Sequence, residues 1–185
     1  MKSFSPYLIE ILISCLLYVG FFFLNGLATE NLRVNSNVSW LFLPAGLCIF
    51  LTLIFSYTSA IGLTIAALII NYFADFPHDL ITTFGVAFIC GFSPLISRLF
   101  VINHFQVDPD LNNITAQQLI LIILIFALFN SGLHQLWFIT RSLEIGGWNS
   151  FVAMFIGDIL GSIIFILIIK YGIIWIKKRL HKFPS

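Results

Sequence analysis

Residues 148–169 read WNSFVAMFIGDILGSIIFILII and contain one charged side chain, that of Asp158. This run predicts a transmembrane helix, because about 20 apolar residues are enough to cross the hydrocarbon core of a bilayer. A carboxylate near the centre of such a helix costs roughly 2.5 to 3.5 kcal/mol, so Asp158 must face protein, water or a partner rather than lipid. Two interpretations follow: a protonated or hydrogen-bonded Asp158 that only joins helices, or an outward-facing site for a small ligand or a proton.

The whole chain shares this apolar character. Hydrophobic residues make up 59% of its 185 residues and charged residues only 9%, whereas soluble domains are roughly 45–50% apolar and about 25% charged. The composition predicts an all-α integral membrane protein, with a single membrane domain over residues 1–185. The expected loops are too short to hold a soluble catalytic or nucleic-acid-binding domain.

Hydropathy predicts a bundle of six transmembrane helices. Residues 34–74 carry no charge, which is enough for two crossings, and the polar residues 56–59 mark the break between them. Pro77 and its flanking acids predict the next turn, and residues 112–115 offer N-caps for the fifth helix. The expected helices cover residues 7–28, 40–56, 60–76, 80–100, 115–138 and 148–174.

The basic residues predict the orientation of the bundle. With six crossings both termini lie on the same side, and residues 175–185 are strongly basic, so we expect them to form a cytoplasmic tail. Only Arg33 and Arg141 then fall outside, and the other seven basic residues fall inside. The sequence therefore predicts an N-in, C-in topology.

Polar residues within the predicted spans gather toward the outer side of the membrane. On the fifth helix Asn130, His134 and Trp137 follow the spacing i, i+4, i+7 and are expected to share one face. A single Asn or His in a span more often joins helices than binds a ligand. Their clustering nevertheless predicts an outward-opening pocket, to which we assign Asn71, Asn130, His134 and Asp158.

Two further local patterns concern helix geometry. Pro44 and Gly46 predict a break or kink near the outer end of the second helix, with freed carbonyl groups available to a ligand, although a proline in the first helical turn is an equal alternative. Gly157 and Gly161 form a small-residue pattern that predicts close helix packing, as does Gly62 with Ala66. Around Asp158, the two glycines are expected to admit another backbone that donates to the carboxylate.

No enzyme, metal site or cofactor is expected. Cys15, Cys48 and Cys90 lie in separate apolar spans without Cys-x-x-Cys spacing, and are most simply buried hydrophobic side chains. His134 is the one histidine inside a predicted span, and no spacing argument pairs it with Asp158 for acid–base chemistry.

Three elements resemble the MASE1 membrane-associated sensor domain in order and spacing, over roughly residues 36–170. They are Trp40-Leu-Phe-Leu-Pro44-Ala45-Gly46, an apolar span ending in Ala67-Leu-Ile-Ile-Asn71, and Gly157-Asp158-x-x-Gly161. MASE1 domains are bacterial multi-helix membrane modules that usually precede cyclase, phosphodiesterase or histidine kinase domains and are thought to sense an unidentified signal. The resemblance adds Trp40, Pro44 and Gly46 to the expected ligand-binding residues and places the protein in the bacterial inner membrane.

Only the basic tail follows the sixth predicted helix, so the resemblance implies a stand-alone sensory or ligand-binding subunit, without an output domain, that relays its signal to a partner protein in the bilayer. Two alternatives remain. Six helices in this length are also similar to the substrate-binding components of energy-coupling-factor vitamin transporters, although the first helix lacks their Ala-x-x-x-Ala-like face. The protein could also be a structural subunit of a membrane complex, which would need no pocket. No nucleic-acid partner is expected under any of these readings.

Overall fold

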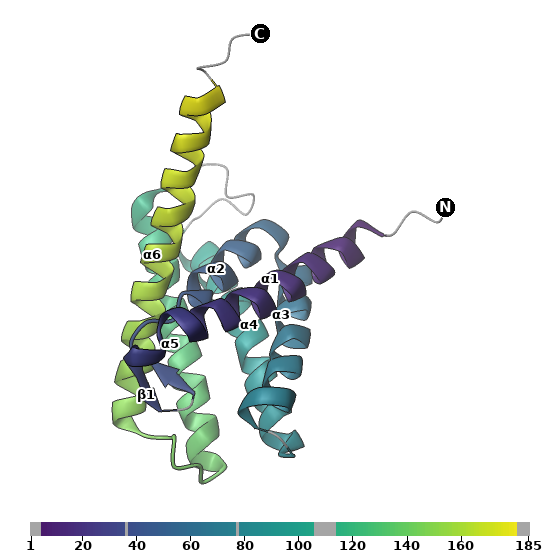
Figure 1. The fold of residues 1–185 in the computed structure, drawn as a ribbon, viewed down its shortest axis with the longest axis vertical. Coiled ribbons are helices and arrows are strands. Elements are labelled where there is room, and N and C mark those ends of the chain that lie inside the picture. The colour runs from purple at the N-terminus through teal and green to yellow at the C-terminus, as the bar shows by residue number, and fades with distance from the viewer. Residues whose placement is uncertain (1–4, 36, 77, 106–113, 181–185) are drawn as a thin grey trace.

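The computed structural model describes residues 5–35, 37–76, 78–105 and 114–180, which form a bundle of α-helices (Figure 1). A short 3-10 turn, η1, and a two-stranded antiparallel hairpin follow the first helix, and one turn of π-helix, η2, extends the third. The elements in chain order are α1 Pro6–Ala28, η1 Glu30–Leu32, β1 Arg33–Asn35, β2 Val38–Ser39, α2 Pro44–Phe55, α3 Tyr57–Ile70, η2 Asn71–Asp75, α4 Leu80–His104, α5 Ala116–Thr140 and α6 Trp148–Leu180.

Five of these helices are long and apolar enough to cross a membrane: α1, α3 together with η2, α4, α5 and α6. The second predicted span is shorter than expected, because α2 has only 12 residues, or about 18 Å at 1.5 Å per residue. Residues 40–43 are not helical, and Pro44 stands in the first turn of α2 rather than at a kink. The expected helix over residues 40–56 is therefore wrong at its start, since proline fits the first turn, where its missing N–H is not needed.

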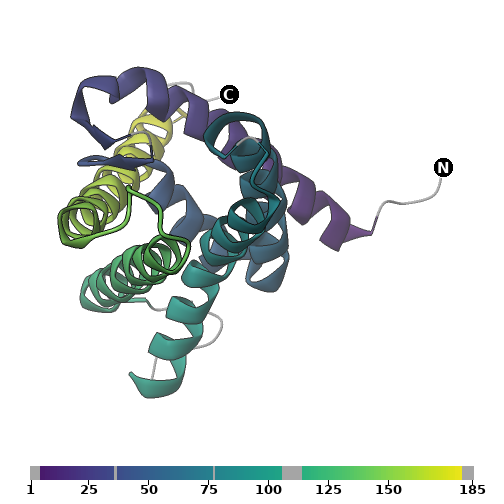
Figure 2. The same cartoon turned by 90° about the horizontal axis from the view of Figure 1, so that it is seen from below.

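The short helix α2 lies in the middle of the bundle. Figure 2 shows it between the pair α5 and α6 on one side and α3 and α4 on the other. Its side chains Leu47, Ile49 and Leu51 are almost fully buried, and they belong to the same apolar core as Leu63 of α3 and Phe126 of α5. A helix that is apolar all round is expected in such a position, because every face meets another helix.

The break predicted at residues 56–59 is shorter than expected, because α3 starts at Tyr57 rather than at residue 60. Ser56 adopts a positive φ of 54° and separates α2 from α3. Thr115 caps α5 in a capping box with Gln118, as the polar residues before that helix predicted, whereas Asn112 and Asn113 lie outside the described residues. Asp79 caps α4 by accepting a hydrogen bond from the Thr82 N–H at 3.0 Å.

Polar contacts tie the helices together at one end of the bundle. Thr58 Oγ1 donates to Glu10 Oε2 at 2.6 Å and joins the start of α3 to α1. Arg98 Nη1 donates to Ser56 Oγ at 3.0 Å and joins α4 to the α2–α3 break. The hairpin, the start of α4 and the α5–α6 loop lie at the opposite end, which is the lower end in Figure 1.

Helix α1 crosses the bundle obliquely (Figure 1) and packs mainly against α3. The close approach depends on Gly62, where a Cβ atom would lie 2.6 Å from the Ile11 carbonyl oxygen and 2.7 Å from Ser14 Cβ. The small-residue pattern on the third helix therefore does mark a packing contact. The opposite face of α1 is apolar and exposed, with Leu16 at 70% and Leu27 at 80%, as expected for a surface in contact with lipid.

Gly157 and Gly161 of α6 also allow a close contact, but the element that packs against them is not a helix. They face residues 39–43, the non-helical segment that leads into α2, which we call the 39–43 segment. A Cβ atom at Gly157 would overlap the Ser39 carbonyl oxygen, and one at Gly161 would overlap that of Phe42. The Phe42 N–H donates to the Gly157 carbonyl at 3.1 Å. We expected a backbone N–H to donate to the Asp158 carboxylate. The backbone of the 39–43 segment bonds instead to the backbone of α6.

Candidate functional site

A cavity of about 110 Å³ lies between the helices, toward the end of the bundle that carries the hairpin. Its wall combines α1, the hairpin, α3 with η2, α4, α5 and α6, so that residues far apart in the sequence meet around it. We call it the Asp158 cavity. Its polar lining residues are Tyr18, Asn25, Thr29, Arg33, Asn37, Ser39, Asn71, Asp75, Asn130, His134 and Asp158.

Asp158 is fully buried in the protein and lines this cavity. Its Oδ2 atom accepts a hydrogen bond of 2.8 Å from Asn130 Nδ2, which joins α6 to α5. Its Oδ1 atom is also buried and has no hydrogen-bond partner among the described residues. One carboxylate oxygen therefore joins two helices, and the other has no hydrogen-bond donor among the described residues.

Helix α5 contributes Asn130, His134 and Phe138 to the cavity wall. His134 Nδ1 lies 2.8 Å from the Asn130 main-chain carbonyl oxygen. A carbonyl can only accept, so this nitrogen carries the proton, and Nε2 of the neutral ring is left as an acceptor. Asn130 and His134 line the cavity from this face, whereas the Trp137 ring packs over Gly85 of α4. At about 100° per residue, Asn130, His134 and Phe138 follow one another in steps of about 40°, so the lining stripe drifts around the helix and away from Trp137.

Helix α3 ends in the π-helical turn η2, which presents both Asn71 and Asp75 to the cavity. Asn71 is buried, and its Nδ2 donates to the Ala67 carbonyl within its own helix at 2.7 Å. Short π-helical turns occur frequently at functional sites. All four pocket residues assigned from the spans, Asn71, Asn130, His134 and Asp158, thus line one cavity.

The three residues that the MASE1 resemblance added, Trp40, Pro44 and Gly46, do not line it. Trp40 is 43% exposed beside the hairpin, and its main-chain N–H donates to the Leu32 carbonyl at 2.9 Å. Gly46 packs against α6, where a Cβ atom would overlap Phe165. Pro44 starts α2, and Gly46 lets α2 approach α6.

The hairpin and its cavity-lining residues were not predicted. Asn35 and Asn37 flank its turn, Val38 is buried, and Arg33 at the start of β1 lines the cavity. The alternation of polar and apolar residues over residues 33–39, with asparagines at the turn, is typical of a short hairpin and was the available signal. Tyr18, whose hydroxyl accepts a hydrogen bond from Cys90 Sγ at 3.2 Å, gave no such signal in an apolar span.

Asn25, near the end of α1, holds the 39–43 segment in place. Its Oδ1 atom accepts a hydrogen bond of 3.0 Å from the Leu43 N–H, one of the free donors at the start of α2. The Thr29 hydroxyl in turn donates to the Asn25 carbonyl at 2.8 Å. The side of the cavity that faces α1 is therefore fixed by hydrogen bonds that also determine where α2 begins.

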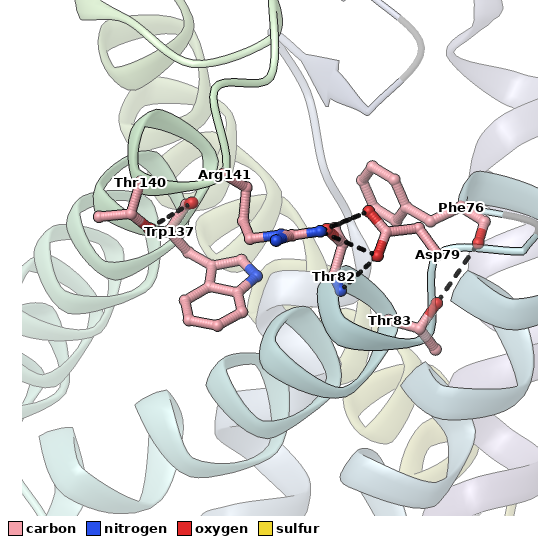
Figure 3. A network of polar contacts seen from close by, with 7 residues as sticks. All are labelled: Phe76, Asp79, Thr82, Thr83, Trp137, Thr140 and Arg141. Atoms are coloured by element: carbon pink, nitrogen blue, oxygen red, sulfur yellow. Dashed lines mark hydrogen bonds and ion pairs between the residues drawn. The ribbon is translucent and has the colours of Figure 1, made fainter.

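An ion pair fixes the adjacent ends of α4 and α5 at the same end of the bundle (Figure 3). Arg141 Nη2 lies 3.2 Å from Asp79 Oδ1, and Arg141 Nε donates to Thr82 Oγ1 at 3.2 Å. The Thr82 hydroxyl completes the ring by donating to Asp79 Oδ2 at 2.6 Å. The hydrogen bonds from Thr82 and then Arg141 lower the pKa of the Asp79 carboxyl, so this pair persists at neutral pH.

The described residues contain no group of three His, Cys, Asp or Glu side chains arranged to hold a metal ion. Cys15, Cys48 and Cys90 are free thiols on α1, α2 and α4, and Cys90 lines the Asp158 cavity.

Comparisons with models of known protein families, with curated proteins and with solved structures give no match to this chain.

Proposed function

We propose that this protein is a MASE1-like sensory or ligand-binding subunit of the bacterial inner membrane, and that it binds a small ligand in the Asp158 cavity. The observation that carries the proposal is the buried Asp158 Oδ1 atom, which lines the cavity and has no partner among the described residues. An unpaired buried acceptor costs about 1–3 kcal/mol, and a ligand that pairs with it removes this cost.

The position of Asp158 on α6 supports a role in relaying the signal. This helix has 33 residues, or about 50 Å, which exceeds the roughly 30 Å of the hydrocarbon core. Its last turns extend past the other helices (Figure 1) and carry Lys177, Lys178 and Arg179. Binding at Asp158 acts on the same continuous helix that presents this basic end to a partner protein.

The cavity size favours this function over vitamin transport. Pockets for drug-sized ligands measure about 300–1,000 Å³, whereas the Asp158 cavity has about 110 Å³. At about 30 Å³ per water molecule, it holds a few waters or a ligand of similar size.

Hydrogen–deuterium exchange of the whole chain in lipid nanodiscs tests the proposal against a panel of small neutral, anionic and cationic solutes. We expect at least one solute to slow exchange near Asn130 and Asp158 and to alter exchange in residues 171–180. Asp158→Asn should abolish both effects. Glu10→Gln is the matched control, because Glu10 bonds to Thr58 away from the cavity, and it should respond as the wild type does. A panel in which no response depends on Asp158 would contradict the proposal.

The proposal includes an N-in, C-in topology, which places the hairpin, Arg33 and Arg141 outside and the basic end of α6 in the cytoplasm. An alkaline phosphatase fused after Ser185 is expected to be inactive in a bacterial host, whereas a green fluorescent protein fused there should fluoresce. Active phosphatase with no fluorescence would invert the orientation and make the cavity open toward the cytoplasm.

A further inference from the structure

The hydrogen bonds around the Asp158 cavity define the chemistry of its ligand. Asn130 Nδ2 donates to Asp158, and Asn71 Nδ2 donates to the Ala67 carbonyl. Each amide therefore uses one of its two N–H groups inside the protein, and keeps the other N–H and its carbonyl oxygen for further hydrogen bonds. His134 behaves in the same way, because its Nδ1 proton is directed to the Asn130 carbonyl and Nε2 is left as an acceptor.

These acceptors accompany a carboxylate oxygen that lacks a donor. Asp158 Oδ1 is buried and without a hydrogen-bond partner in the described parts of the chain. An ionised carboxylate removed from water carries a large desolvation cost unless an opposite charge or several donors compensate it. A ligand that is a cation and also an N–H donor satisfies both needs.

The charges of the cavity wall favour one positive charge in the ligand. Two carboxylates, Asp75 and Asp158, line the cavity together with one guanidinium, that of Arg33. Arg33 interacts electrostatically with Asp75. With both carboxylates ionised, the lining is therefore one positive charge short.

We propose that the Asp158 cavity binds a small monovalent cation that carries N–H groups, ammonium or a short primary ammonium ion. Asp158 Oδ1 balances its charge, and the free acceptor atoms of Asn71, Asn130 and His134 receive its N–H groups. The proposal rests on the proposed function that this cavity takes a ligand, and it adds the class of that ligand. The imidazole nitrogen favours an N–H donor over an alkali ion, because Na⁺ and K⁺ prefer oxygen ligands.

The volume limits the size of the alkyl group. The cavity, at about 110 Å³, is well below the roughly 300–1,000 Å³ of pockets for drug-sized ligands. Ammonium with its remaining water, or methylammonium, fits this space. Tetramethylammonium has the charge but no N–H group and is considerably larger.

Isothermal titration of the purified chain in nanodiscs, at constant ionic strength made up with choline chloride, tests the proposal with named probes. We expect ammonium and methylammonium chloride to bind, and sodium, potassium and tetramethylammonium chloride not to bind. Asp158→Asn should weaken ammonium binding at least about tenfold, because hydrogen bonds to a charged acceptor are the stronger ones. Glu10→Gln should bind ammonium as tightly as the wild type does.

Asn71→Ala provides a second variant that should not threaten the fold, since the Asn71 amide hydrogen donates within its own helix. It is expected to weaken ammonium binding about threefold or more. Binding of Na⁺ or K⁺ in preference to ammonium, or ammonium binding that is unchanged in both cavity variants, would overturn the inference. Acetate and urea separate this failure from that of the proposed function: if either binds through Asp158, the cavity is a ligand site of another class, and the proposed function stands.

Discussion

Gly161→Ala is expected to destabilise the protein by about 3 kcal/mol, at the upper end of the range for overpacked sites. The added Cβ atom would overlap the Phe42 carbonyl oxygen and lie 2.9 Å from the Leu43 nitrogen. Both are backbone atoms of the 39–43 segment, which cannot move aside as the end of a flexible side chain can. The free energy of unfolding in detergent, followed by circular dichroism, measures the effect.

Gly172→Ala is the matched control for this prediction. Gly172 lies on the same helix, and a Cβ atom there would have no neighbouring atom within 4 Å. Alanine has a higher helix propensity than glycine, so this variant should be unchanged or more stable by up to about 1 kcal/mol. Equal stability of the two variants would mean that the 39–43 segment does not lie against α6.

Asp158→Asn is expected to abolish the ligand response while the unfolding free energy stays within about 1 kcal/mol of the wild-type value. Asparagine keeps an oxygen that accepts from Asn130 Nδ2, so the contact between α5 and α6 survives. The charge that faces the cavity is lost. Hydrogen exchange for the response, and chemical unfolding for the stability, measure the two effects on the same preparation.

Asp158→Leu separates binding from packing. It removes the acceptor for Asn130, and hydrogen bonds between membrane helices contribute about 0.6 kcal/mol on average, so we expect a modest loss of stability and a folded protein. If Asp158→Asn responds normally while Asp158→Leu fails to fold, Asp158 is a packing residue and the cavity binds nothing through it.

The periodic features of the sequence predict most of the fold. Long apolar runs give five helices of membrane length, and capping residues such as Thr115 mark where helices begin. The start of α2 was misplaced because hydropathy cannot distinguish an apolar extended segment from an apolar helix. Residues 40–43 are as apolar as α2 itself, but they are not helical and they pack against Gly157 and Gly161.

The strongly polar cavity residues that lie within membrane spans could be predicted from the sequence, whereas those in the connections could not. Asn71, Asn130, His134 and Asp158 stand out because a polar side chain in a span must avoid lipid. Arg33 lies in a connection, where charge is ordinary, so its sequence position carries no such signal. Gly46 lies within a predicted span and a sequence motif, yet its observed contact is the packing of α2 against α6.

The contact between the 39–43 segment and α6 has a mechanical consequence. Backbone atoms clasp α6 at Gly157 and Gly161, one turn apart and on either side of Asp158 in the sequence. From Gly161 to Arg179 the helix continues for about 27 Å at 1.5 Å per residue. A tilt of α6 by about 5° about this contact displaces its basic end by roughly 2 Å. A small change in the angle of the helix beside Asp158 therefore becomes a larger movement at the end that carries Arg179.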